Sequence, residues 1–276
     1  MDSFAHGAPL TATLGRALVL CAAAWGTAAA LQLGLWLVSL RTRNAGIVDV
    51  GWAGSFAIVV GVFAALGDAP LAATWPFVAM VAAWSLRLTG YLVVRGAASG
   101  AEEGRYRELR QRWSPHPDRA FLVFFQAQAL LTGILSIGFV WPFVAAPTTQ
   151  VPIVIGGVVW AIGLVGETVA DAQLRAFKRD PASKGKVCDV GLWSWSRHPN
   201  YFFETCVWTG YALACAPFVG GWLAWIAPAI ILSSILKVTG IPATEAQARR
   251  SKGDAYRAYQ ARVSAFVPRP PRKERP

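Results

Sequence analysis

The feature that most constrains this chain is a series of apolar runs, each about 20 residues long, separated by polar connections. A run of this length lets an α-helix cross the roughly 30 Å hydrocarbon core of a bilayer. Lipid offers the backbone no hydrogen-bond partners, so crossing segments of this kind have to be helical. We therefore predict an all-α, polytopic membrane helical bundle with about seven transmembrane helices. The candidate spans are residues 14–40, 47–66, 75–94, 121–144, 152–170, 200–216 and 222–236.

The basic residues divide the connections into two kinds. The chain has 26 Lys and Arg residues, yet the connections at 67–75, 145–152 and 217–221 contain none. This positive-inside pattern predicts an amino terminus outside and a cytoplasmic carboxyl-terminal tail at 237–276, in the inner membrane of the cell. The formal net charge of +11 then reflects topology, so membrane lipids and not nucleic acid are the expected partners. We expect one membrane domain over the whole chain.

Cysteine and histidine give no indication of a metal site. The three histidines are dispersed, and the four cysteines have no CxxC spacing. We expect the cysteines to be small packing residues and no metal to be bound.

The stretch GLWSWSRHPNYFFE at residues 191–204 places a dense group of polar side chains at the start of an apolar run. Proline disfavours helical geometry in the residue before it, so a helix is predicted to begin at Pro199 or Asn200. The free N–H groups of that helix start, beside Arg197 and His198, would form an anion site. We include Tyr201 among the candidate cofactor contacts.

Glu204 strengthens the functional interpretation of this stretch. A carboxylate one turn inside an apolar helix is costly without a partner, and such residues are candidates for function. The alternative is a membrane-interface anchor, in which Trp193, Trp195 and Tyr201 lie at headgroup level and Arg197 extends toward lipid phosphate.

Three further groups of polar residues lie at the predicted cytoplasmic side. Asp49 falls in the first turn of the second span, where the helix dipole or a cation of the bundle would stabilise it. Arg87 and Tyr91 share one face of the third span, and Arg105 begins a charged segment that we predict to be a short amphipathic helix. At the end of the fifth span, Glu167, Asp171 and Arg175 recur every four residues, with Lys178 one turn beyond; a GxGxxG nucleotide motif is absent.

Together these motifs resemble a known group of proteins: bacterial membrane proteins of unassigned function related to the steroid 5-alpha-reductase carboxyl-terminal domain, within the sterol reductase superfamily. The resemblance covers most of the chain, through VDVGW, WSLRLTGYLVVR, EEGRYRELR, GETVADAQLRAFK, GLWSWSRHPNYFFE, TGIPATE and YRAYQARVSAFVPRPP. It implies an integral-membrane reductase that uses NADPH to reduce a carbon-carbon double bond in a lipid or steroid-like substrate. The cofactor-binding residues it implies are Arg87, Arg105, Asp171, Arg175, Lys178, Asn200, Glu204 and Tyr256.

The chain departs from the steroid reductases at two catalytic positions. Their Gln-Glu pair on an early helix is replaced by Asp49, and their catalytic tyrosine corresponds to Trp84. An indole cannot protonate a substrate oxygen, so Asp49 or Tyr91 becomes the candidate group that polarises the substrate.

Two other functions stay open. The RHPxY motif followed by an acidic tail also resembles isoprenylcysteine and phospholipid methyltransferases, which bind S-adenosylmethionine. Those tails carry paired glutamates, whereas Glu245 in this tail has no neighbouring glutamate, and we therefore favour the reductase at this point. The third function is a non-enzymatic lipid-binding protein, which the basic face and the aromatic residues alone would suit.

Overall fold

The architecture is helical, as the apolar runs predict. The computed structural model describes residues 9–97, 101–238 and 240–272, and in this part of the chain two isolated bridges occur but no strand. By length and composition, six helices among these described residues are able to cross a membrane. The prediction of an all-α, multi-pass membrane protein is confirmed, while its orientation stays a prediction.

Two compact units make up the chain, and the prediction of a single membrane domain is not tested by this division. The first unit contains Met1–Gln150 and Cys215–Ala224, and the second contains Val151–Ala214 and Trp225–Pro276. Each unit is described by itself.

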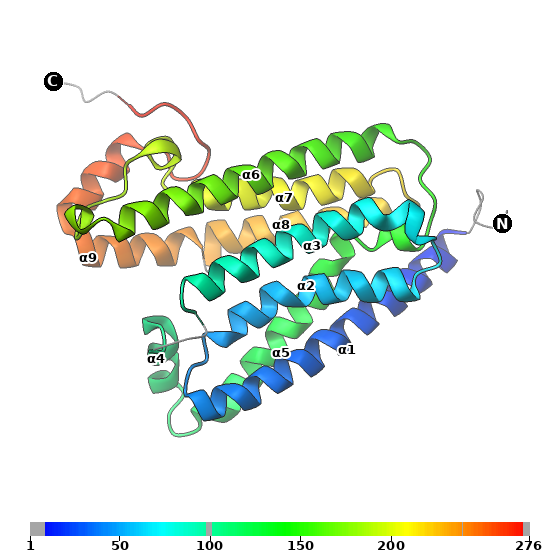
Figure 1. Cartoon of the computed structure of the whole chain (residues 1–276), viewed down its shortest axis with the longest axis horizontal. Helices are drawn as coiled ribbons and strands as arrows, with labels where there is room; N and C mark the ends of the chain where they lie inside the picture. Colours follow the sequence, from blue (N-terminus) through cyan, green and yellow to red (C-terminus); the bar gives the residue numbers. More distant parts are fainter. Residues whose placement is uncertain (1–8, 98–100, 239, 273–276) are drawn as a thin grey trace. The chain divides into compact units, whose positions relative to one another are not determined.

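The first unit is formed by four long helices and one short one (Figure 1). Helix α1 packs against α2 and α5, and α2 also packs against α3 and α5. The short helix α4 packs against α5. The bounds are α1 (Leu10–Thr42), α2 (Ile47–Leu66), α3 (Leu71–Val94), α4 (Gly104–Arg112) and α5 (Pro117–Leu135), followed by the 3-10 turns η1 (Ser136–Gly138) and η2 (Trp141–Phe143).

Small polar residues fasten the helices of this unit to each other. The Ser85 hydroxyl of α3 donates to the Ala53 carbonyl of α2 at 2.6 Å and accepts from the Ala57 N–H at 3.0 Å. Gln126 of α5 donates to the Ala29 carbonyl of α1 at 3.4 Å. Hydrogen bonds between helices are a usual device of membrane bundles, where packing has little hydrophobic driving force.

The second unit is organised on the long helix α6 (Val151–Arg179), beside which α7 (Pro199–Cys215) runs (Figure 1). A Cβ atom added at Gly156 would lie 2.4 Å from the Ala214 nitrogen, and one at Gly163 would lie 2.7 Å from the Val207 nitrogen. The two helices therefore touch backbone to backbone, which only glycine permits. The remaining elements of this unit are η3 (Pro181–Ser183), η4 (Gly191–Ser194), α8 (Ile226–Ser233), the π-helical turn η6 (Ser234–Val238) and α9 (Ile241–Arg262). The 3-10 turn η5 (Gly221–Trp225) belongs to the first unit except for its last residue.

Several predicted span boundaries differ from the structure. The span predicted at 121–144 is helical only to Leu135 and then continues as η1 and η2, which contain Gly138 and Pro142. The span predicted at 152–170 continues as helix to Arg179. Helix α7 matches the span predicted at 200–216, but at 17 residues it is shorter than the six candidate spans.

Candidate functional site

In the first unit, Asp49 is joined to Arg105 and Tyr106. Asp49 lies in the first turn of α2, and the other two residues lie on α4. The Arg105 guanidinium forms an ion pair with the Asp49 carboxylate. The Tyr106 hydroxyl donates to Asp49 Oδ1 at 2.8 Å and accepts from Arg105 Nη2 at 2.8 Å. The cation that Asp49 was predicted to meet within the bundle is therefore the one from the charged segment.

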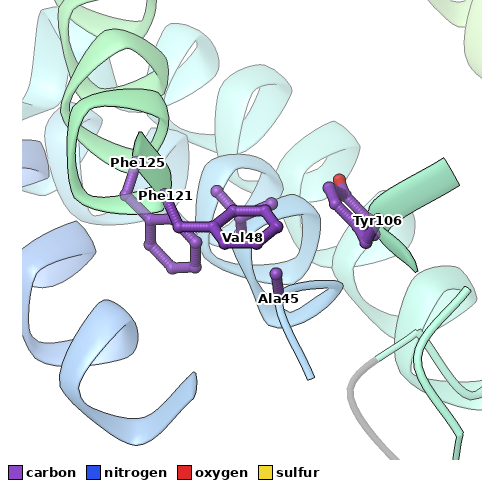
Figure 2. Packing of buried hydrophobic residues seen from close by; sticks show 5 residues of the cluster. All are labelled: Ala45, Val48, Tyr106, Phe121 and Phe125. Carbon is purple, nitrogen blue, oxygen red and sulfur yellow. The ribbon is translucent and has the colours of Figure 1, made fainter. Parts of the chain in front are cut away.

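An apolar cluster fixes the position of Tyr106. Its ring is 1 % exposed and belongs to a cluster with Ala45, Val48, Phe121 and Phe125, shown in Figure 2. Burial raises the pKa of the Tyr106 hydroxyl, and the negative charge of Asp49 raises it further. The phenol therefore keeps its proton near neutral pH and remains a hydrogen-bond donor.

A second ion pair holds the segment before α4 against the start of α2. Glu102 accepts the Ala45 N–H at 2.9 Å and two hydrogen bonds from Arg110, at 2.8 and 3.0 Å. Burial acts to raise the pKa of Glu102, but the hydrogen bonds from Arg110 and Ala45 outweigh it and leave the pKa below its ordinary value. We call these contacts of Glu102 the Glu102 clamp. They hold the segment that leads into the Asp49 cluster, which consists of Asp49, Arg105 and Tyr106.

Two other predicted residues of this unit meet on α3. The Arg87 guanidinium lies over the Tyr91 ring, 5.7 Å from its centroid, as the spacing of four along a helix allows. Trp84, one turn earlier, is fully buried.

In the second unit, Arg197 is the centre of the polar contacts. Its Nε donates to Glu245 Oε1 at 2.6 Å, and its Nη1 donates to the carbonyls of Gln260 and Val263 at 3.0 and 2.6 Å. Gln260 in turn donates to Glu245 Oε2 at 2.7 Å. The side chains of Arg197 and Glu245 are each 11 % exposed, so the pair is largely withdrawn from solvent. Arg197 therefore joins the start of α7 to α9 and to the chain that follows it.

The next residues of the motif present polar atoms to the interior. Helix α7 begins at Pro199, as predicted. His198 is 3 % exposed, and its Nε2 lies 3.5 Å from Glu245 Oε1 with no closer hydrogen-bond partner among the described residues. Asn200 Oδ1 is likewise buried and unpaired in the described part of the chain. The Tyr201 ring stacks on the His198 ring, with centroids 5.4 Å apart.

The predicted row on α6 lies next to the loop that leads into this motif. Asp171 is buried, Arg175 is half-buried and Lys178 is exposed. The Trp193 indole of η4 donates to the Ala170 carbonyl at 2.9 Å, and Gln173 Oε1 accepts the Leu192 N–H at 2.9 Å. Trp193 is buried by this packing, so its assignment as a headgroup-level anchor is wrong.

Helix α9 contributes buried residues that the sequence interpretation largely missed. Glu245 entered that interpretation only as a lone tail carboxylate, although it is the partner of Arg197. Tyr256 was predicted, and it packs with Tyr259 and Val263 in an apolar cluster. Gly253, with a φ of 53°, interrupts α9 between Glu245 and Gln260, so spacing along a single helix could not have shown that these two residues meet. Within the described residues, no His, Cys, Asp or Glu group is arranged to hold a metal.

Comparison with known proteins gives a family but no described function. A family model described as "Protein of unknown function (DUF1295)" matches residues 35–263. The chain belongs to the DUF1295 family. The match includes both the Asp49 cluster and the Arg197 motif, so the family pattern extends over both units.

One curated relative of this DUF1295 chain is named for an enzyme activity. It is similar to the "Probable O-methyltransferase ustE" of Ustilaginoidea virens, with 41% identity over 66 residues. That stretch is 24% of this chain and 23% of the relative, so the chain spans less than a quarter of the relative that it matches. No solved structure matches the chain.

Proposed function

We propose that this membrane protein is an S-adenosylmethionine-dependent methyltransferase that acts on an oxygen of a lipid-like substrate. The observation that carries the proposal concerns the RHPN motif (Arg197 to Asn200). The Arg197 guanidinium donates to protein acceptors, while Asn200 Oδ1 is buried and has no hydrogen-bond partner among the residues that the structure describes. A motif arranged in this way offers an acceptor to an ammonium group more readily than a cation to a phosphate.

The residues present fit the amino-acid end of S-adenosylmethionine. Helix α7 begins at a proline, and its first N–H groups suit a carboxylate. Asn200 Oδ1 supplies an acceptor for the ammonium group that neighbours such a carboxylate. Glu204 follows Asn200 by four residues and so shares its helix face, where negative charge favours a sulfonium cation.

When bound, S-adenosylmethionine would supply a methyl group to a substrate hydroxyl: the oxygen–carbon bond would form, the carbon–sulfur bond would break with its electron pair left on sulfur, and the hydroxyl proton would pass to water. The chain's own contribution is to bind and orient. Glu245 and Arg197 hold the start of α7 in place, and the His198 ring is kept in its orientation by stacking on Tyr201. The similarity to a relative named as an O-methyltransferase supports the same chemistry.

A second candidate is the NADPH-dependent reductase that the resemblance to steroid reductases implies. The observation that favours it is the group of basic residues around the end of α6, where Lys178, Arg179, Lys184 and Lys186 are exposed. Such a group suits the phosphates of a dinucleotide. Two features count against a phosphate at the RHPN motif itself. The Arg197 guanidinium already donates to protein acceptors, and the Glu204 carboxylate is nearby.

Ligand binding to the purified chain in detergent separates these functions. We expect S-adenosylmethionine to bind with micromolar affinity in isothermal titration calorimetry and NADPH to bind at least tenfold more weakly. Asn200→Ala should weaken binding at least tenfold. The control is Thr205→Val, because the Thr205 hydroxyl bonds only within its own helix, to the Tyr201 carbonyl.

The opposite preference, NADPH over S-adenosylmethionine, would make the reductase the correct function. If the purified chain is folded, as its unfolding temperature shows, and binds neither S-adenosylmethionine nor NADPH, the non-enzymatic lipid-binding function remains. An Asn200→Ala variant that binds S-adenosylmethionine like the wild type would remove the motif from the cofactor site.

A further inference from the structure

The segment that follows α9 folds back onto the RHPN motif and forms a pocket with it. The Arg197 N–H donates to the Ser264 carbonyl at 2.8 Å, and the Ser196 hydroxyl donates to the Phe266 carbonyl at 2.7 Å. Further on, the Arg269 N–H donates to the Trp195 carbonyl at 3.1 Å. Hydrogen bonds to residues 195–197 therefore hold the segment after α9 in place.

This pocket has a volume of about 210 Å³ and lies within the second unit. It is lined by the end of α9, by the segment that follows α9, and by four arginines: Arg197, Arg262, Arg269 and Arg272. Pockets for drug-sized molecules occupy roughly 300 to 1,000 Å³. The volume suits a small headgroup and is too small for a dinucleotide or for S-adenosylmethionine.

The four arginines differ in how their charge is balanced. Arg197 is paired with Glu245 at 2.6 Å, and Arg262 is paired with Asp189 at 2.8 Å. In the described part of the chain, Arg269 and Arg272 form no ion pair with a carboxylate. The pocket thus carries about two uncompensated positive charges, the charge that a phosphate monoester dianion would neutralise.

The backbone of the two uncompensated arginines is held in place before any ligand arrives. Arg272 is fixed through its main chain, because its N–H donates to the Arg262 carbonyl at 3.0 Å. Pro268, Pro270 and Pro271 flank the arginines and restrict their backbone. A preordered backbone reduces the entropy lost on binding, and each guanidinium group presents a planar fork that matches phosphate oxygens.

We propose that this arginine pocket binds a phosphate monoester, through Arg269 and Arg272, at a site distinct from the one proposed for the methyl donor. Two sources carry that group, a lipid such as phosphatidic acid and a soluble phosphate ester. Because the pocket excludes the methyl donor by size, this proposal stands independently of the proposed function.

The test uses the full chain in phosphatidylcholine nanodiscs, with glycerol 3-phosphate and short-chain phosphatidic acid as separate probes. We expect at least one probe to bind, and Arg269→Gln/Arg272→Gln to weaken that binding at least tenfold. The control is Arg250→Gln/Arg257→Gln, which removes the same charge from exposed positions of α9 and should change binding less than twofold. Binding should also weaken below about pH 6, where a phosphate monoester takes up its second proton.

The probes distinguish the sources. Phosphatidic acid binding tenfold tighter than glycerol 3-phosphate assigns the site to a lipid headgroup, and equal affinities assign it to the phosphate ester itself. The proposal is overturned if neither probe binds, if both double variants lose binding equally, or if phosphatidylglycerol, a diester, binds as well as phosphatidic acid.

Discussion

The Tyr106 hydroxyl donates a 2.8 Å hydrogen bond to the Asp49 carboxylate, although 57 positions separate the two residues. Arg105 completes the contact by pairing with the same carboxylate. Through this cluster, the charged segment after α3 is fixed on the first turn of α2. Asp49 accepts from both partners, so its oxygens act as acceptors, and its assignment as a proton donor stays a prediction.

Removing the phenol should measure how strongly this cluster holds the fold. We expect Tyr106→Phe to reduce the free energy of unfolding by about 1 kcal/mol, because a hydrogen bond to a half-buried carboxylate is lost. The loss should shrink in an Asp49→Ala background, since the two changes remove the same interaction. Equal losses in both backgrounds, measured by thermal unfolding in detergent, would show that the two groups are not energetically coupled.

The Glu102 clamp predicts a dependence of stability on pH. Glu102 has a folded-state pKa below its ordinary value of 4.5, so it stabilises the fold fully above about pH 4.5. That stability is lost as the pH falls through the folded-state pKa. We expect Glu102→Gln to cost about 2 kcal/mol at pH 7 and much less at pH 3. The unfolding temperatures of both proteins from pH 3 to 7 test this, and a constant gap between them would contradict it.

Two adjacent glycines of α6 offer a matched test of the α6–α7 contact. A Cβ at Gly156 would lie 2.4 Å from the Ala214 nitrogen, whereas one at Gly157 would have no atom within 4 Å. Gly156→Ala should therefore destabilise the protein by about 2 kcal/mol, and Gly157→Ala should be neutral or stabilise it by up to about 1 kcal/mol. Similar unfolding temperatures for the two variants would contradict the close contact.

The orientation of the first unit is open to labelling. The Trp36 indole of α1 donates to the Asp118 carbonyl of α5 at 3.0 Å, so the end of α1 and the start of α5 lie together. In a background without the native cysteines, Arg41→Cys and Arg119→Cys should both react only from the cytoplasmic side. Asp68→Cys should react only from the other side, because Asp68 pairs with Arg16 near the start of α1. Labelling of Arg41→Cys from outside would reverse the predicted orientation.

The helices were predictable because lipid leaves the backbone few alternatives. Long apolar runs located all four long helices of the first unit, and the proline of the RHPN motif located the first residue of α7. The misplaced boundary at Leu135 arose because hydropathy does not distinguish an α-helix from apolar 3-10 turns. The hydropathy of a segment indicates whether lipid or water surrounds it. The backbone geometry of this segment depends instead on Gly138 and Pro142.

The sequence predicted which residues belong to the candidate site better than it predicted which of them contact one another. Arg105 and Asp49 were both expected to matter, and the structure joins them. Arg197 was expected to face an anionic ligand, but Glu245 takes that place. Spacing along one helix predicts which residues share a face, whereas pairing across distant helices depends on tertiary packing, which one sequence does not encode in a readable pattern.

The hydrogen bonds that hold residues 264–272 against the RHPN motif also affect where a purification tag should be placed. Only four residues separate Arg272, which lines the arginine pocket, from an affinity tag fused after Pro276. An acidic epitope tag there would compete with the phosphate probes for the guanidinium groups. Purification through the amino-terminal end keeps the pocket clear for the binding measurements.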